Sequence, residues 1–220
     1  GKYIREQIDS LLRQTEQNFL LYVSDDGSTD STYDILEEYA QQYPNKIFVG
    51  KNNGQHGAKH NFMHMMIAHK NDYIMLCDQD DVWLDNKIEV TLRAMKEQEK
   101  IHGAQTPLLI HTDLCVVDEN LNIIDKSYRH MMNANYARTE LKDQIIQNTL
   151  TGCTAMYNRA LADLILKEPE FCVMHDWWLI LVASALGKVH AIDRQTILYR
   201  QHGGNAVGVR KMHSPLYMLH

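Results

Sequence analysis

The feature that most constrains the fold is an alternation of short apolar runs with helical patterns through the first half of the chain. Strand-type apolar runs cover residues 19–24, 46–50 and 73–78, and a helical pattern follows each of them. This repetition is typical of a mostly parallel sheet with covering helices. Ligands of such sheets bind at the carboxyl ends of the strands. The sequence therefore predicts an α/β, Rossmann-like fold with its site at those ends.

After Thr106 the pattern changes. Strand-like segments at 108–118, 151–158, 189–192 and 195–202 are interleaved with helical patterns at 159–166 and 175–187. We see no repeat or linker, so we predict one domain over residues 1–220. Within it, residues 1–105 form a nucleotide-type half, and residues 106–220 form a mixed half that could build a second pocket.

Composition excludes several classes of function. The formal net charge is −6 and no long basic run occurs, which argues against a nucleic-acid partner. The four cysteines form no CxxC pair, so we expect reduced thiols in a cytoplasmic protein. No signal-peptide pattern is present, and no apolar run approaches the roughly 20 residues that cross a bilayer.

Three carboxylates, Asp78, Asp80 and Asp81, close the third apolar run. A solvated turn with a helix N-cap is the simplest interpretation. A calcium-binding EF-hand loop is excluded, because Trp83 stands where a loop counted from Asp78 requires glycine. The remaining interpretation is a Mg²⁺ or Mn²⁺ site shared with a substrate diphosphate, since these ions use one or two carboxylates and complete their shell with phosphate and water.

A second acidic pair, Asp25 and Asp26, follows the first apolar run. The pair fits an Asx turn with a helix cap. It also fits recognition of a nucleotide base or ribose, because carboxylates accept hydrogen bonds from N–H and O–H donors. Two acidic sites at strand ends strengthen the prediction of a nucleotide ligand.

Seven motifs together resemble the inverting nucleotide-sugar glycosyltransferases of family 2, whose fold is called GT-A. Spread from Glu6 to Asn205, they are EQIDSLLRQT, VSDDGSTDST, NNG with Lys59 and Asn61, LCDQDDVW, TGCTAMYNRAL, HDWW and ILYRQHGGN. The sequences of the motifs DQDDVW, HDWW and YRQHGGN most resemble those of the bacterial rhamnosyltransferase-like branch, which builds surface polysaccharides. Family members open with an apolar strand before the first helix, and the resemblance implies that this chain lacks that strand.

The resemblance implies a donor site for a nucleoside-diphosphate sugar, either dTDP-rhamnose or a UDP-hexose. Asp25 and Asp26 would hold the uracil or thymine ring and the ribose. Lys59 would contact phosphate, and Asp78 would reach the ribose or a metal-bound water.

It also implies a metal site and a general base. Asp80 would bind Mg²⁺ or Mn²⁺ that bridges the donor diphosphate, with His202 as a further metal or diphosphate ligand. Asp176 would take the proton from the acceptor hydroxyl. Aromatic surface beside Asp176 raises the pKa of a carboxylate and a helix N-terminus lowers it, so the sequence leaves the direction open.

The acceptor implied by the resemblance is a saccharide or a lipid-linked saccharide. A lipid-linked acceptor would bring the protein to the inner face of the cell membrane as a peripheral protein. Two alternatives stay open at this point. One is a nucleotidyltransferase, although the Gly-rich basic loop of that class is absent, and the other is a non-catalytic carbohydrate-binding scaffold.

Overall fold

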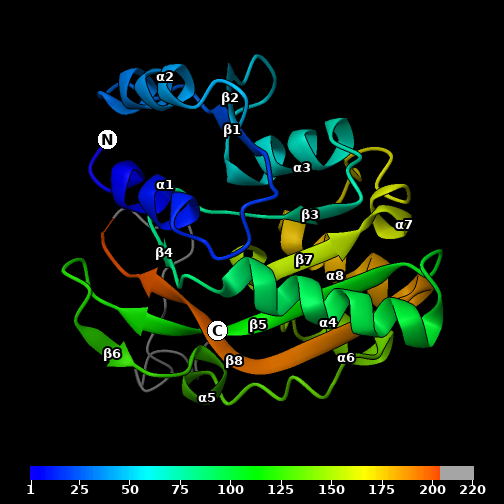
Figure 1. The fold of residues 1–220 in the computed structure, drawn as a ribbon. Helices are drawn as coiled ribbons and strands as arrows, with labels where there is room; N and C mark the ends of the chain where they lie inside the picture. The colour runs from blue at the N-terminus through cyan, green and yellow to red at the C-terminus, as the bar shows by residue number, and fades with distance from the viewer. Residues whose placement is uncertain (204–220) are drawn as a thin grey trace.

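The computed structural model describes residues 1–203, in which helices and strands alternate through the first half as the sequence predicted (Figure 1). The helices are α1 (Ile4–Leu12), α2 (Thr32–Gln42), α3 (Ala58–Ala68), α4 (Lys87–His102), α5 (Tyr128–Met131), α6 (Leu141–Ile146), the 3-10 turn η1 (Gly152–Thr154), α7 (Arg159–Ala162) and α8 (His175–Leu186). The strands are β1 (Leu21–Asp25), β2 (Ile47–Lys51), β3 (Tyr73–Met75), β4 (Val82–Trp83), β5 (Leu108–Val117), β6 (Ile123–Asp125), β7 (Ala155–Asn158) and β8 (Lys188–Arg200).

The strands form two sheets rather than one. β1 and β2 pair in parallel, as predicted. The larger sheet has the order β3-β7-β5-β8-β4, with β6 beside β5. Only its β5–β8 pairing is parallel, whereas β3 and β4 pair antiparallel with β7 and β8. The fold is therefore a mixed α/β fold, and strands from the two predicted halves share one sheet. The assignment of separate roles to residues 1–105 and 106–220 stays a prediction.

The larger sheet is buried on both faces around β5. Because side chains alternate along a strand, Leu108 and Ile110 pack with Met95 of α4, whereas Leu109 packs on the opposite face with Leu179 of α8. This explains why β5 reads as a continuous apolar run. Each such buried side chain contributes about 1.5–3 kcal/mol to stability. In Figure 1, α4 crosses in front of the sheet and α8 lies behind it.

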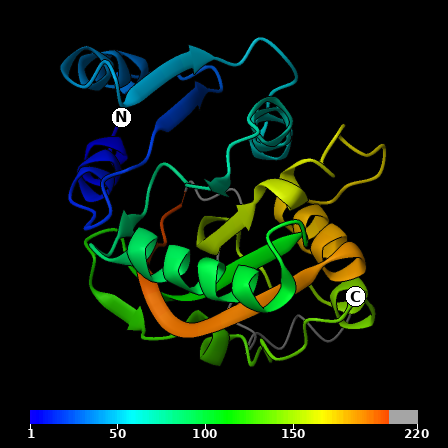
Figure 2. The same cartoon turned by 45° about the vertical axis from the view of Figure 1, so that its right-hand side comes forward.

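The smaller sheet has a core of its own with α1 and α2. Ile8, Leu36 and Ile47 are almost fully buried there. Figure 2 shows β1, β2, α1 and α2 grouped on one side of the larger sheet.

The last strand differs from the prediction of two short strands. β8 is continuous from Lys188 to Arg200 and bends strongly (Figure 2), and its pairing with β5 shifts register on either side of Asp113. Because of this bend, β8 pairs with both β5 and β4. It also carries the end of β8, with His202 just beyond it, to the loop that follows β3.

Helix α8 ends at Gly187, as the sequence predicted. A Cβ atom at Gly187 would stand 2.0 Å from the main-chain oxygen of Pro107, so the close approach of β8 to the start of β5 requires glycine.

Two further findings bear on the composition. The four cysteines are free thiols. None of the helices within residues 1–203 combines the length and the apolar character needed to cross a membrane.

Candidate active site

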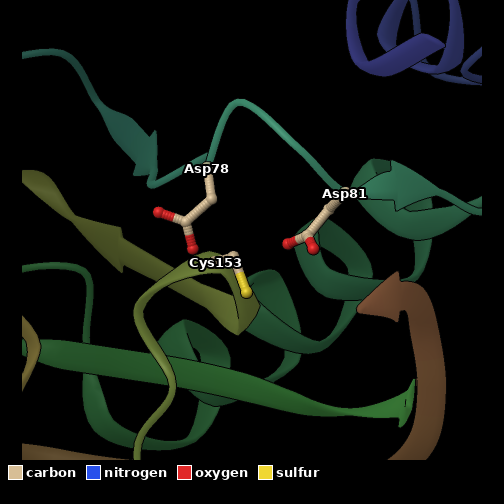
Figure 3. A group of neighbouring side chains, drawn as sticks. All are labelled: Asp78, Asp81 and Cys153. Carbon is tan, nitrogen blue, oxygen red and sulfur yellow. The ribbon is translucent and has the colours of Figure 1, made fainter. Parts of the chain in front are cut away.

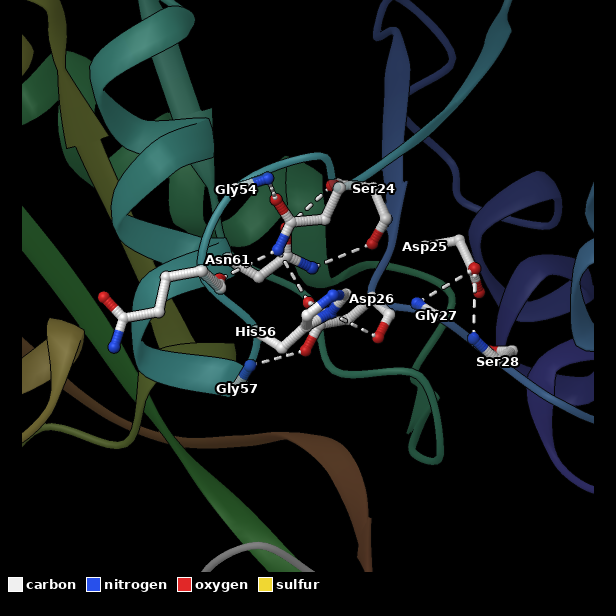
Figure 4. A network of polar contacts seen from close by, with 11 residues as sticks. Ser24, Asp25, Asp26, Gly27, Ser28, Gly54, His56, Gly57 and Asn61 are labelled. Carbon is white, nitrogen blue, oxygen red and sulfur yellow. Dashed lines mark hydrogen bonds and ion pairs between the residues drawn. The ribbon is translucent and has the colours of Figure 1, made fainter.

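The first acidic pair closes β1 and shapes the loop that follows. The Asp25 carboxylate accepts hydrogen bonds from the main-chain N–H groups of Gly27 and Ser28, at 3.2 and 3.1 Å (Figure 4). Gly27 has a φ of +88°, a conformation that favours glycine. Asp25 therefore acts as the Asx turn that its sequence context allowed, with its side chain buried.

Asp26 joins this loop to the loop after β2. Its carboxylate accepts from Asn52 Nδ2 at 2.6 Å and from the N–H of Gly57 at 2.7 Å, and His56 Nδ1 lies 3.1 Å from Oδ1 (Figure 4). Burial acts to raise the pKa of Asp26, but these hydrogen bonds outweigh it and the pKa is lowered. Asp26 is thus an ionised acceptor held at the carboxyl ends of β1 and β2.

Helix α3 enters the same network through Asn61. Ser24 Oγ donates to Asn61 Oδ1 at 2.7 Å, and Asn61 Nδ2 donates to the main-chain oxygen of Ser24 at 2.9 Å. Lys59, near the start of α3, contacts a different region. Its Nζ donates to the main-chain oxygen of Cys172 at 3.2 Å and lies 3.5 Å from Glu168 Oε1. The described contacts of Lys59 are therefore with the segment before α8 rather than with the strand-end aspartates.

The loop after β3 places Asp80 against the segment after β8. Asp80 is buried, and its Oδ2 lies 2.8 Å from His202 Nε2. The Tyr3 ring packs against His202, with 4.9 Å between the ring centroids. The predicted pair of metal ligands, 122 residues apart in the chain, is thus brought together.

Arg200 organises this region, and the sequence analysis missed it. Its Nε donates to the main-chain oxygen of Asp80 at 2.8 Å, and its main-chain N–H donates to Asp81 Oδ1 at 3.0 Å. Its Nη1 donates to the main-chain oxygen of Glu119 at 2.6 Å, and its Nη2 pairs with the Glu6 carboxylate. A single arginine with 2% exposure thereby ties the aspartate loop to β8 and α1.

Asp78 and Asp81 point toward the thiol of Cys153, which is carried by η1 (Figure 3). One ligand atom from each of these three residues lies within 4.8 Å of the others. Burial raises the pKa of Asp78 to about 7, and the negative charges of Asp80 and Asp176 add to this rise. Burial and the charge of Asp78 hold the pKa of Asp81 well above its usual range. The loop therefore concentrates negative charge, as its sequence indicated.

A lysine lies behind this charge in the protein core. Lys87 is fully buried, donates to Thr196 Oγ1 at 3.4 Å and lies 4.6 Å from the centre of the Trp83 ring. Burial lowers the pKa of Lys87 to about 8, while the nearby Cys153 thiol and the Asp81 carboxylate act to raise it. Lys87 offsets one of the carboxylate charges from the inner side.

Asp176 stands in the first turn of α8. Its carboxylate accepts from the N–H of Trp177 at 2.6 Å and from the N–H of Gly152 at 3.2 Å, with Asn148 Nδ2 at 3.4 Å. Burial raises the pKa of Asp176 to about 6 although these hydrogen bonds act to lower it. The sequence left the direction of this pKa shift open, and in the structure it is upward. The negative charge of Asp176 in turn raises the pKa of Asp78.

The structure thus brings His202 to Asp80 and brings Asp176 close enough to Asp78 for its charge to raise the pKa of that carboxyl, while Asp25 and Asp26 lie at the end of β1. The Asp80–His202 pair fits a divalent cation. Two adjacent ligands of an octahedral ion with bonds of 2.0–2.1 Å stand about 3 Å apart, close to the observed 2.8 Å. A carboxylate oxygen and an imidazole nitrogen are suitable donors, and the surrounding carboxylates favour a cation.

Comparison with known proteins agrees with this geometry. Residues 1–166 match the family described as "Glycosyl transferase family 2". The dTDP-rhamnosyl transferase RfbG of Shigella flexneri is 27% identical over 221 residues, which cover 94% of this chain and 71% of that protein.

Two solved structures share the fold. TarS of S. aureus in complex with UDP has a TM-score of 0.64 at 20% identity, over 90% of this chain and 56% of that one. The mannosyltransferase PcManGT of Pyrobaculum calidifontis, in complex with GDP-Man and Mn2+, has a TM-score of 0.65 at 13% identity, over 92% of this chain and 54% of that one. The chain spans little more than half the length of both structures.

The fold is that of the GT-A glycosyltransferases. The chain belongs to glycosyl transferase family 2.

Proposed function

We propose that this domain is an inverting, metal-dependent glycosyltransferase that moves a sugar from a nucleoside-diphosphate donor to a saccharide acceptor. The observation that carries the proposal is the contact of Asp80 with His202 at 2.8 Å, on a loop whose Asp78 is close enough to Asp80 and Asp176 for both negative charges to raise its pKa. Family membership favours this activity over a nucleotidyltransferase and over a non-catalytic carbohydrate-binding scaffold.

The donor would lie across the carboxyl ends of β1 and β3. In this proposal Asp25 and Asp26 accept hydrogen bonds from the base and the ribose, and Asp78 contacts the ribose or a metal-bound water. Lys59 contacts the diphosphate only if it leaves Glu168. The ionised state of Asp26 supports its role, because an anionic acceptor bonds strongly to N–H and O–H donors.

Asp80 and His202 would hold Mg²⁺ or Mn²⁺, and the bound cation supplies positive charge to the leaving diphosphate. Arg200 keeps the Asp80 main chain in place, and Asp81 is fixed by the Arg200 N–H. The Mn2+ in the complex of PcManGT with GDP-Man supports a divalent ion for the fold.

Asp176 would act as the general base on the acceptor side. The acceptor hydroxyl attacks the anomeric carbon on the face opposite the departing diphosphate, and its proton passes to the Asp176 carboxylate. Attack on that face inverts the anomeric centre. A carboxyl with a pKa of about 6 is ionised near neutral pH and is basic enough to accept this proton.

The name of RfbG supports dTDP-rhamnose as the first donor to test, and the UDP in TarS supports a UDP-hexose as the second. We propose a saccharide or lipid-linked saccharide acceptor in bacterial surface polysaccharide synthesis. The free thiols support the proposed cytoplasmic location, at the inner face of the membrane when the acceptor is lipid-linked.

Release of nucleoside diphosphate from a panel of nucleotide sugars, with Mn²⁺ and with a chelator, tests the proposal. Asp176→Asn should bind the donor as its parent does but release diphosphate about 10²–10⁴-fold more slowly. Asp163→Asn is the matched control, because Asp163 is exposed and pairs only with Arg159 on α7 among the described contacts. Undiminished turnover by Asp176→Asn would show that another group is the base.

The metal assignment has a separate test. Asp80→Ala should abolish the Mn²⁺-dependent part of donor binding in calorimetry. Equal donor affinity with Mn²⁺ and with chelator in the parent protein would remove metal dependence from the proposal.

A further inference from the structure

The group of Asp78, Asp81 and Cys153 offers a set of donors different from that of the Asp80–His202 pair. It combines two carboxylates with one thiol, and Figure 3 shows the two carboxylates directed toward the sulfur from either side. Asp81 and Cys153 have 0% and 1% exposure, while Asp78 keeps partial access. A ligand would enter past Asp78 and meet the two buried groups behind it.

One buried oxygen of this group lacks a conventional hydrogen bond. Asp81 Oδ1 accepts from the Arg200 N–H, whereas within residues 1–203 Oδ2 has no conventional donor and the carboxyl is otherwise reached only by the weakly donating thiol of Cys153. A buried carboxylate oxygen without a donor is costly, so such an atom indicates a ligand. Because Arg200 holds the Asp81 side chain in place, Oδ2 is already positioned to bind a metal ion.

The local charges favour a cation. Asp78, Asp80 and Asp81 bring three carboxylates into one loop, whereas Lys87 is the cation on the inner side. Arg200 does not add a free positive charge, because its guanidinium pairs with Glu6. The acidic groups thus outnumber the local cation, and a metal ion that binds here would displace the protons that burial keeps on them.

The neighbouring thiol of Cys77 is engaged elsewhere. Gln7 Nε2 donates to Cys77 Sγ at 3.0 Å, and the thiol lies 3.3 Å from the main-chain oxygen of Asp78. Cys77 is therefore a nearby half-buried thiol outside the Asp78–Asp81–Cys153 group, and it provides a matched control.

We propose that Asp78, Asp81 and Cys153 form a second divalent-metal site that takes a thiophilic ion such as Zn²⁺ or Cd²⁺. A thiolate selects these ions over Mg²⁺ and Mn²⁺, which prefer oxygen donors. Cys153 would bind as the thiolate and release its proton to solvent. Two donors of a tetrahedral zinc ion, with bonds of about 2.3 Å to sulfur and 2.0–2.2 Å to oxygen, stand about 3.3–3.7 Å apart, so any of these ligand atoms that lie farther apart, within their 4.8 Å limit, must close. Rotation of the partly accessible Asp78 side chain supplies this movement.

Occupation of the site would withdraw Asp78 from the donor. Zn²⁺ should therefore inhibit transfer at concentrations of Mn²⁺ that sustain it, a consequence that rests on the proposed function. Binding itself does not rest on that function and is measured without a sugar donor.

The test is titration of the full chain with Cd²⁺, followed by the ultraviolet charge-transfer band of a cadmium–thiolate bond. The parent protein should develop the band with one Cd²⁺ bound per chain. The band should be lost in Cys153→Ala and kept in Cys77→Ala. Asp81→Asn should weaken Cd²⁺ binding about tenfold or more. Melting curves of each variant, measured without metal, identify any variant that fails to fold, and Cys153→Ser then replaces Cys153→Ala.

Two results would overturn the site: the absence of a thiolate band in the parent, or a band that persists in folded Cys153→Ala or Cys153→Ser. Neither result would touch the proposed function, which depends on Mn²⁺-dependent diphosphate release. Conversely, a Cd²⁺ band in a protein that releases no diphosphate from any donor would sustain the site and count against the proposed function.

Discussion

The guanidinium of Arg200 donates from Nε to the main-chain oxygen of Asp80 at 2.8 Å. The main-chain N–H of Arg200 donates to the carboxylate of Asp81, on the same loop, at 3.0 Å. Arg200 is the last residue of β8, and His202 follows it at 2.8 Å from Asp80. One strand end therefore both fixes the aspartate loop and supplies the second candidate metal ligand. This coupling makes the position of Asp80 depend on Arg200.

Arg200→Ala should accordingly weaken Mn²⁺ binding and destabilise the fold. The substitution leaves the Asp80 and Glu119 main-chain oxygens without the Arg200 donor, and each buried acceptor left unsatisfied costs about 1–3 kcal/mol. Calorimetry with Mn²⁺ and urea unfolding measure the two effects. Arg13→Ala is the control, because Arg13 is exposed and 3.9 Å from Asp85, and it should change both by little. Unchanged Mn²⁺ affinity in folded Arg200→Ala would separate Arg200 from the metal site.

The sequence predicted the parts of this site that depend on local pattern. Apolar runs ending in aspartates placed Asp25 and Asp78 near strand ends, and Gly187 marked the end of α8. Short strands such as β3 carry too few residues for periodicity to reveal a partner. The antiparallel pairing of β3 with β7 was therefore not predictable, nor was the separation of β1 and β2 from the larger sheet.

The residues that the sequence analysis missed act over long separations in the chain. Arg200 contacts Asp80 across 120 positions, and Cys153 reaches Asp78 and Asp81 only through the 3-10 turn before β7. The only sequence signal for Arg200 was its place beside His202 in YRQH, at the end of an apolar strand. The predicted roles of Lys59 and Asp176 stay predictions, although the charge of Asp176 raises the pKa of Asp78 and Lys59 pairs with Glu168.

Asp78→Asn should stabilise the metal-free protein, and increasingly so as pH rises. The pKa of Asp78 is about 7 in the folded chain and its ordinary value is 3.8, so the native state favours the protonated form. Ionisation therefore removes stability as pH rises from about 4 to 7. Because Asp78 is partly accessible, the gain from the amide is about 1–2 kcal/mol at pH 8 and near zero at pH 4. Melting temperatures of the variant and its parent, compared at each pH, cancel the titration of other groups. An equal difference at both pH values would contradict the assigned pKa.

The pH dependence of transfer should report Asp176. The carboxylate must be ionised to accept a proton, so kcat/KM should rise with pH through about 6 and level off above it. Asp176→Glu, which keeps the carboxylate but shifts its position and hydrogen bonds, should move this midpoint while lowering the plateau. Rates from pH 4.5 to 8.5 at saturating Mn²⁺ measure the profile. A profile that is flat through pH 6, with chemistry shown to limit the rate, would assign the base elsewhere.

Gly152→Ala should impair transfer more than donor binding. A Cβ at Gly152 would stand 2.9 Å from His175 Nε2 and 3.5 Å from Asp176 Cβ, so the buried imidazole of His175, in the first turn of α8, must shift away from η1. The same movement would stretch the hydrogen bond from the Gly152 N–H to Asp176. Displacement of a reacting group by even about 1 Å can cost roughly 100-fold in rate, so we expect kcat to fall about tenfold or more with little change in donor affinity.

Gly50→Ala is the matched control for that substitution, because a Cβ at Gly50 on β2 would meet no atom within 4 Å. It should leave both kcat and donor affinity near those of the parent. Single-turnover rates and calorimetric donor affinity distinguish the two variants. The opposite result would be a Gly152→Ala protein that loses donor affinity and keeps kcat. That result would place the Gly152 turn beside the nucleotide instead of the acceptor. The added methyl group would then disturb the donor through Cys153 and Asp78 rather than the base Asp176.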